Sequence, residues 1–180
     1  MKIVGISGSL RTGSLNTKLL HACRKFLPNN VEFVEGSIDL PLYTGNEDEY
    51  PESVEKLREL VHSADALFIT CPEYNWNMST PLKNAIDWLS LGGKDAPINN
   101  HVVGLAGVGG GRLGSVRAQM AVRSTLLHNK VWVVPGPEVL IAPNENTFDE
   151  NGDLTDPIAI KLVKDVLDEL VRVAPILSVN

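Results

Sequence analysis

The chain has 180 residues, 43% of them hydrophobic and 21% charged, and 16 Lys and Arg against 22 Asp and Glu give a net charge of −6. These values are ordinary for a globular protein, and the length favours a single domain over residues 1–180. The acidic balance argues against a nucleic-acid-binding protein, and no uncharged run reaches the ~18–20 residues that cross a bilayer. Cys23 and Cys71 are too few for a disulfide framework and lack metal-site spacing, so we expect a cytoplasmic protein without a metal.

Strand-like and helix-like segments alternate along the chain. In chain order, hydrophobic periodicity predicts a strand at Lys2–Ser7, a helix at Leu15–Leu27, a strand at Val31–Ile38, a loop at Asp39–Tyr50, a helix at Glu52–Ala64, a strand at Ala66–Cys71, a helix at Thr80–Leu91, a strand at His101–Gly107, a helix at Leu113–His128, a strand at Val131–Pro135 and a helix at Pro157–Val173. Five strands and five helices in alternation predict an α/β, flavodoxin-like three-layer sandwich. Its five-stranded parallel sheet would have the order 2-1-3-4-5, with helices on both faces.

Three unusual loops follow the predicted strands, at Gly8–Ser14, Pro72–Ser79 and Gly107–Gly111. Because ligands of such sheets bind beyond the carboxyl ends of the strands, these loops are the candidate site.

The first loop carries hydroxyl, amide and guanidinium donors where a helix begins, as an anion site requires. Its Gly8 and Gly13 have the spacing of a nucleoside-triphosphate-binding loop, but Ser14 stands where the lysine of that motif belongs. The alternative is a glycine turn in which Ser14 only caps the helix.

The other two loops suggest a flat ligand. Aromatic and amide side chains in Pro72–Ser79 could hold a heteroaromatic ring, although a proline-rich turn that covers the core would have a similar composition. The glycines of Gly107–Gly111 would let a ligand approach the backbone and form an edge wall of the same site.

Four motifs together resemble the NADPH-dependent FMN reductase family, a flavodoxin-like group with chromate/quinone reductase and azoreductase relatives. They are GSLRTGSLN (Gly8–Asn16), DLPLY (Asp39–Tyr43), PEYN (Pro72–Asn75) and LKNAIDW (Leu82–Trp88). The resemblance implies bound FMN, with NADPH or NADH as electron donor. Hydride would pass to the flavin N5, and electrons then to quinones, free flavin, azo compounds or metal oxyanions by a ping-pong mechanism. No catalytic side chain is then required.

The resemblance also implies roles for individual residues. The residues that would bind the FMN phosphate are Ser9, Arg11, Ser14, Leu15 and Asn16. Those that would contact the flavin ring are Pro72, Glu73, Tyr74 and Asn75. The ring and ribityl region would lie beside Gly107, Val108, Gly109, Gly110 and Gly111. The Leu82–Trp88 helix region implies a homodimer or homotetramer in which Trp88 and Leu89 could be interface residues.

Several assignments stay open. The segment Trp76–Thr80 departs from the family pattern, and Trp76 either caps an acceptor pocket or packs on a partner subunit. Glu73 is a proton donor or stabilises a turn, whereas Cys71 is expected to be a buried structural thiol. Arg112 and Arg117 either meet the 2′-phosphate of NADPH or face solvent. The alternative function is a flavodoxin-type FMN electron carrier that a protein partner reduces.

Overall fold

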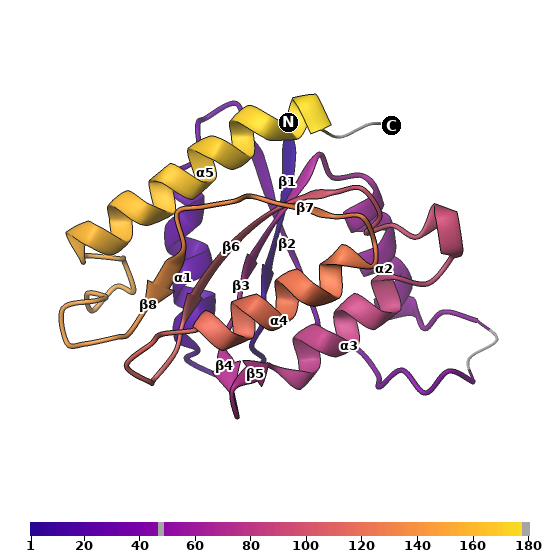
Figure 1. Cartoon of the computed structure of the whole chain (residues 1–180), viewed down its shortest axis with the longest axis horizontal. Helices are drawn as coiled ribbons and strands as arrows, with labels where there is room; N and C mark the ends of the chain where they lie inside the picture. Colours follow the sequence, from indigo (N-terminus) through magenta and orange to yellow (C-terminus); the bar gives the residue numbers. More distant parts are fainter. Residues whose placement is uncertain (47–48, 178–180) are drawn as a thin grey trace.

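A computed structural model of the chain describes residues 1–46 and 49–177. At its centre lies a parallel sheet in the order β2-β1-β3-β6-β7, with β8 also paired to β6 (Figure 1). The order 2-1-3-4-5 is therefore confirmed, with β7 and β8 together in the fifth place. The strands are β1 (Lys2–Ser7), β2 (Glu32–Gly36), β3 (Ala66–Thr70), β6 (Val102–Val108), β7 (Trp132–Val133) and β8 (Val139–Ile141).

The fifth strand is interrupted, so the prediction of one strand at Val131–Pro135 is wrong in its extent. The N–H of Val134 still donates to the carbonyl of Val103 at 2.9 Å, after which the pairing stops. Pro135 and Pro137 cannot donate a backbone hydrogen bond to a sheet ladder. Pairing with β6 resumes only in β8, at the carboxyl end of the sheet.

All five predicted helices form, with ends that differ by a few residues, and a short 3₁₀ helix at Gly93–Asp95 is added. The last helix continues past Pro175. The predicted loop at Asp39–Tyr50 includes residues 47 and 48, which lie outside the described residues. None of the described helices is long and apolar enough to cross a membrane. The helices are α1 (Leu15–Arg24), α2 (Glu52–His62), α3 (Thr80–Leu89), α4 (Val116–Leu127) and α5 (Pro157–Leu177).

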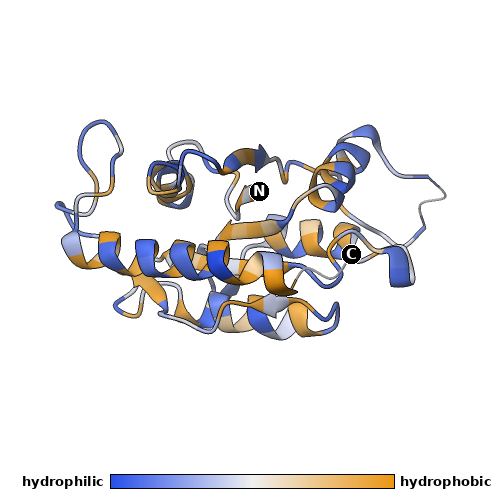
Figure 2. Ribbon diagram, turned by 90° about the horizontal axis from the view of Figure 1, so that it is seen from above, coloured by the Kyte–Doolittle hydropathy of each residue, from blue (hydrophilic) through white to orange (hydrophobic). Residues whose placement is uncertain are grey.

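The helices cover the sheet on both faces, and each face has its own core. Side chains alternate across a strand, so Ile3 packs toward α1 and α5, whereas Val4 packs toward α2, α3 and α4. In Figure 2 most helices change between blue and orange along their length, as expected of amphipathic helices that bury one side. The sheet lies between the two helical layers, as the sandwich prediction requires.

A small hairpin after β3 was not predicted. It consists of β4 (Glu73–Tyr74) and β5 (Asn77–Met78), which pair antiparallel. Asn75 and Trp76 connect them with φ angles of 49° and 65°, the positive values that a two-residue type I′ turn requires. The hairpin lies at the end of the sheet where α3 and α4 begin (Figure 1).

Candidate functional site

The three predicted loops meet at the carboxyl ends of β1, β3 and β6, around a cavity of about 230 Å³. Apart from Asn75, Gly107 and Gly111, every predicted site residue lines this cavity, and Gly13 joins them. The lining consists of Ser9, Arg11, Gly13, Ser14, Leu15, Asn16, Pro72, Glu73, Tyr74, Val108, Gly109 and Gly110.

The first wall of the cavity is the start of α1. The Ser14 hydroxyl accepts the backbone N–H groups of Asn16 at 3.2 Å and Thr17 at 3.4 Å, so it caps this helix. In the described part of the chain, the N–H groups of Gly13 and Leu15 have no protein partner. Unpartnered donors at a helix N-terminus, beside the side chain of Arg11, form a set suited to an anion.

Asn16 connects this wall to the glycine loop. Its side-chain amide donates to the Val108 carbonyl at 2.9 Å and accepts the Val108 N–H at 3.0 Å. The Asn16 carbonyl in turn accepts the Thr70 hydroxyl at 2.9 Å, which joins β3 to the same point. Because both polar atoms of the amide are engaged within the protein, Asn16 shapes the cavity through the backbone that it fixes.

Glu73 is engaged in a comparable way at the second wall. One carboxylate oxygen accepts the N–H groups of Arg117 at 2.8 Å and Ala118 at 3.3 Å, at the start of α4. The other accepts the Arg117 guanidinium at 2.9 Å, and the Glu73 side chain is only 11% exposed. A carboxylate at a helix N-terminus is stabilising. These contacts engage both carboxylate oxygens and join the hairpin to α4.

The glycine loop requires glycine for two different reasons. A Cβ on Gly107 would lie 2.1 Å from the Ser115 hydroxyl and 2.4 Å from the Cys71 carbonyl, so packing behind the cavity excludes a side chain there. Around Gly110 and Gly111, by contrast, a Cβ would meet no atom within 4 Å. The glycines at 110 and 111 thus keep the backbone open to a ligand.

A second, larger cavity of about 680 Å³ adjoins the first, and Tyr74 lines both. The Tyr74 hydroxyl lies 3.3 Å from that of Ser9, so it joins the hairpin to the first loop. Asn75 lines the larger cavity and not the smaller one. The lining consists of Leu42, Tyr43, Tyr74, Asn75, Asn77, Met78, Thr80, Lys83, Asn84, Asp87, Ala121, Ser124 and Thr125.

Two residues that could have been interface residues lie in the core. Trp88 and Leu89 are each 1% exposed within the single chain, and the Trp88 indole donates to the Pro41 carbonyl at 2.8 Å. The exposed side chains of α3 include Thr80 and Lys83 instead.

Cys71 follows β3 directly and is fully buried. Burial, assisted by the nearby Glu73 carboxylate, raises the pKa of the Cys71 thiol to about 12. A protonated thiol is a poor nucleophile. Cys71 is therefore a structural residue, as the sequence predicts.

Fold and site together define a flavodoxin-like protein with a donor-rich loop at the strand order switch. The chain belongs to the NADPH-dependent FMN reductase family, whose sequence pattern matches residues 1–145. An NAD(P)H-dependent FMN reductase of Pseudomonas aeruginosa is 39% identical over 175 residues, covering 94% of this chain and 93% of that protein. A quinone reductase of Escherichia coli is 33% identical, covering 87% and 86% of the two chains.

Structural similarity supports the same assignment. The flavoenzyme NAD(P)H:(acceptor) oxidoreductase FerB of Paracoccus denitrificans superimposes with a TM-score of 0.90 at 29% identity, covering 98% of both chains. The chain is accordingly an oxidoreductase that uses FMN and NAD(P)H, which favours the reductase prediction over the electron carrier.

Proposed function

We propose that FMN binds at the carboxyl edge of the sheet, with its phosphate at the start of α1 and its ring beside the hairpin and the glycine loop. The observation that carries this proposal is the pair of unpartnered N–H groups at Gly13 and Leu15, which line the smaller cavity together with Arg11. The site fits the cofactor, because a phosphate needs converging donors and a ring needs flat walls. Of the predicted ligands, Ser9 and Ser14 would supply hydroxyls and Pro72 and Tyr74 a wall.

Bound FMN would accept hydride from NAD(P)H and pass electrons to the acceptor. The protein's part is to position both partners and to provide backbone donors near the ring. Gly110 supports this role, since its backbone is exposed and has open space around it. Asn16 and Glu73 act indirectly, because they fix the backbones of β6 and α4.

For the acceptor we propose a quinone, bound from the larger cavity. The relatives named quinone reductase support this class. The cavity also combines ring and thioether side chains of Tyr43, Tyr74 and Met78 with amides of Asn75 and Asn84, which suits a small ring with carbonyl groups. Free flavin, azo compounds and metal oxyanions are the competing acceptors to be compared in the same assay.

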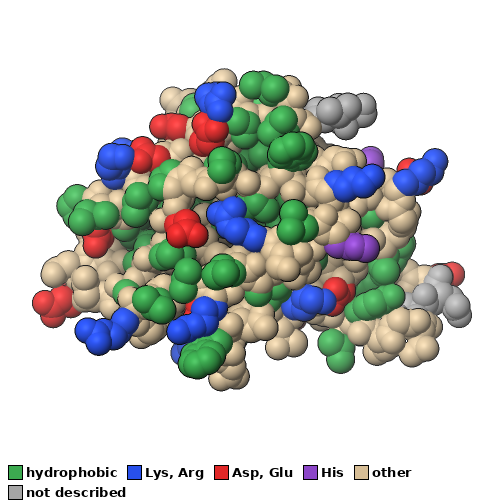
Figure 3. Space-filling model, viewed as in Figure 1, with side chains coloured by type: hydrophobic (Ala, Val, Ile, Leu, Met, Phe, Trp, Pro, Cys, Tyr) green, Lys and Arg blue, Asp and Glu red, His purple; other side chains and the backbone are tan. Residues whose placement is uncertain are grey.

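We also propose a cytoplasmic homodimer or homotetramer. Hydrophobic side chains reach the surface on the face that α4 presents (Figure 3). Two residues of α4 are large, hydrophobic and exposed, Met120 at 63% and Leu127 at 73%. Their separation by seven residues puts them on one side of α4, beside the α3 region expected at the interface. Sedimentation of the purified protein at several concentrations would give the assembly state. The two unpaired, buried thiols agree with a reducing compartment.

The test of the function is the visible spectrum of the purified protein, recorded anaerobically before and after NADPH or NADH. We expect FMN bands that bleach with a nicotinamide and return when a quinone is added. Arg11→Gln should weaken FMN retention, whereas Arg24→Gln, an equal charge change at the far end of α1, should not. A purified protein that binds no flavin, or whose flavin neither nicotinamide bleaches, would contradict the proposal.

A further inference from the structure

The glycine loop before α4 has a rigid base. The N–H of Gly109 donates to the Ile141 carbonyl at 3.0 Å, which fixes the start of the loop to β8. At its other end Gly114 has a φ of +58°, and a Cβ there would lie 2.8 Å from the Leu140 backbone. The N–H of Gly114 also donates to the Gly111 carbonyl at 3.0 Å. The base therefore keeps one conformation against the sheet.

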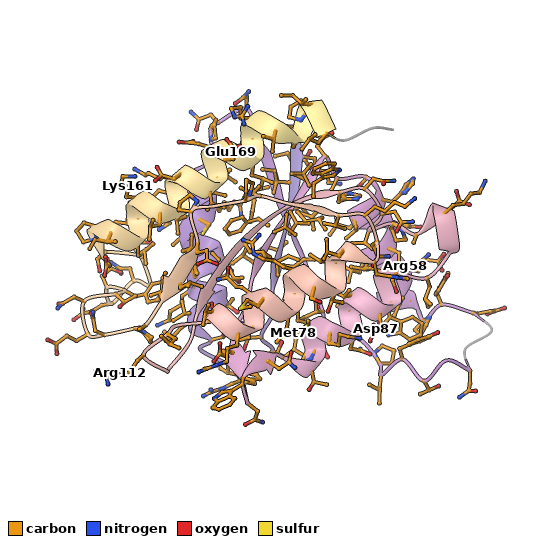
Figure 4. All side chains as sticks on the ribbon, in the orientation of Figure 1. Arg58, Met78, Asp87, Arg112, Lys161 and Glu169 are labelled. Carbon is orange, nitrogen blue, oxygen red and sulfur yellow. The ribbon has the colours of Figure 1, made fainter. Side chains whose placement is uncertain are left out.

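The tip of the loop is open and carries one cation. Gly110 and Gly111 have open space around them, and Arg112 follows them directly. Figure 4 shows Arg112 at the outer end of this loop, with its side chain directed away from the sheet. Arg112 is exposed, and within residues 1–46 and 49–177 its guanidinium has no hydrogen bond, ion pair or aromatic contact. A rigid base thus presents an unpaired guanidinium two residues after Gly110, which lines the smaller cavity.

The other cations around the two cavities have partners or another role. The Arg117 guanidinium is paired with Glu73 and lies 4.6 Å from the ring centroid of Trp76. Lys83 in the larger cavity is paired with Asp87 at 2.6 Å. Arg11 lines the smaller cavity, where we place the FMN phosphate. Among these cations near the site, Arg112 is therefore the one without an assigned partner, and it follows the glycines of the loop just outside the smaller cavity.

The acidic groups at the site also bear on which nicotinamide cofactor binds there. Glu73 is the acidic residue that lines the smaller cavity, and its charge is compensated by Arg117. In dinucleotide-binding Rossmann folds, a carboxylate binds the adenosine ribose hydroxyls of NAD, whereas an arginine accommodates the 2′-phosphate of NADP. The same pairing of an arginine with a phosphate applies in any fold. The loop beyond the smaller cavity offers the Arg112 guanidinium, and the carboxylate of Glu73, which lines that cavity, is already compensated.

We infer that Arg112 binds the 2′-phosphate of NADPH and makes this protein prefer NADPH to NADH. The inference rests on the proposed function, since it assigns the nicotinamide donor to the same site. A guanidinium forms paired hydrogen bonds to a phosphate, and NADH has only a hydroxyl at this position. Arg112 lines neither cavity, so its side chain can bind this phosphate without taking part in the FMN site.

The kinetic test compares Arg112→Gln with the wild type as holoenzyme, using one quinone and both donors. Loss of an exposed arginine–phosphate contact should raise KM for NADPH about three- to tenfold. KM for NADH, kcat and the FMN content should stay unchanged. KM for NADPH in Arg112→Lys should lie between the values of the wild type and Arg112→Gln, because lysine keeps the charge and loses the paired geometry. Arg24→Gln is the matched control and should change neither KM.

A binding measurement gives a readout that does not depend on turnover. Calorimetry with adenosine 2′,5′-bisphosphate should show weaker binding to Arg112→Gln, and adenosine 5′-monophosphate should bind both proteins equally. An unchanged NADPH to NADH ratio in Arg112→Gln, with normal turnover, would overturn this inference while leaving the proposed function intact. Failure of both donors to reduce the wild-type flavin would instead overturn the proposed function.

Discussion

Asn16 and Val108 exchange two hydrogen bonds across 92 positions of sequence, at 2.9 Å and 3.0 Å. The Asn16 amide is 4% exposed and lies between the start of α1 and the end of β6. It reproduces the donor and acceptor pattern of a backbone peptide group. The two loops that flank the smaller cavity are thereby held at one separation, before any ligand arrives.

Asn16→Ala should therefore destabilise the protein strongly. Its loss leaves the buried N–H and carbonyl of Val108 without partners, which costs about 2–4 kcal/mol in free energy of unfolding. FMN affinity should fall as well, because the cavity walls separate. Urea unfolding of the apoprotein and a flavin titration would measure the two effects. Asn29→Ala, an exposed position, is the matched control. A loss below about 1 kcal/mol would contradict the structural role.

Glu73→Gln should reduce stability more than it reduces turnover. The substitution removes the ion pair with Arg117 and weakens the capping of α4, which together are worth about 1–2 kcal/mol. If Glu73 supplied a proton during turnover, kcat would fall about 100-fold or more. We expect kcat to fall less than about threefold and the pH profile to keep its shape. A double-mutant cycle with Arg117→Gln would measure the coupling, and additive losses would refute the pairing.

The sequence predicted those features of the fold that depend mainly on one physical cause, the burial of hydrophobic side chains. Apolar periodicity predicted the five helices, because each helix buries one stripe, and the alternation of strands with helices predicted the sheet order. Local pairing was harder to predict. The hairpin depends on two positive φ angles at Asn75 and Trp76, and the usual signal for such a turn is Asn-Gly. Pro135 and Pro137 could have signalled the interruption of the fifth strand.

Prediction of the site residues met a different obstacle. The sequence identifies polar residues on loops but not the partners that they choose. Asn16 and Glu73 have the chemistry of ligand-binding groups, yet both bind backbone groups of distant elements. Those contacts join segments 92 and 44 positions apart, which only the folded chain brings together. Only the folded arrangement shows that Arg117 is paired with Glu73 and that Arg112 is exposed.

The turn at Trp76 is strained, and the strain can be measured. A bulky residue at a φ of 65° costs about 1 kcal/mol or more, and the stacking of Arg117 on the indole offsets part of it. Trp76→Gly loses the stacking and relieves the strain, so its stability should lie near that of the wild type. Trp76→Ala loses the stacking and keeps the strain.

Consequently Trp76→Ala should be less stable than Trp76→Gly by about 1 kcal/mol, as thermal or urea unfolding would show. Equal stabilities would mean that the turn does not require a positive φ. The same two variants separate the functions open for this residue. A higher KM for the quinone would assign Trp76 to the acceptor pocket, and a changed sedimentation coefficient would assign it to a subunit contact.

The buried thiol of Cys71 makes stability depend on alkaline pH. In the folded state burial raises its pKa to about 12, whereas in the unfolded chain it titrates near about 8.5. Above that lower value the unfolded state loses a proton that the folded state keeps. The free energy of unfolding should then fall with rising pH, at up to about 1.4 kcal/mol per pH unit for one thiol, until the folded thiol also ionises. Below pH 8 the contribution is constant.

Other groups also change charge at alkaline pH, so the free energy of unfolding is measured against pH for both the wild type and Cys71→Ala. The difference between the two curves isolates the contribution of Cys71. Lys and Tyr side chains and the buried Cys23 are common to both proteins, and their contributions cancel. We expect the two curves of unfolding free energy to run parallel up to about pH 8 and then to converge, as the wild type alone loses the Cys71 contribution. Parallel curves up to pH 10, or fast labelling of native Cys71 by a thiol reagent at pH 8, would show that the thiol is accessible to water. In that case Cys71 could not be the inert residue that its burial behind the cavity implies.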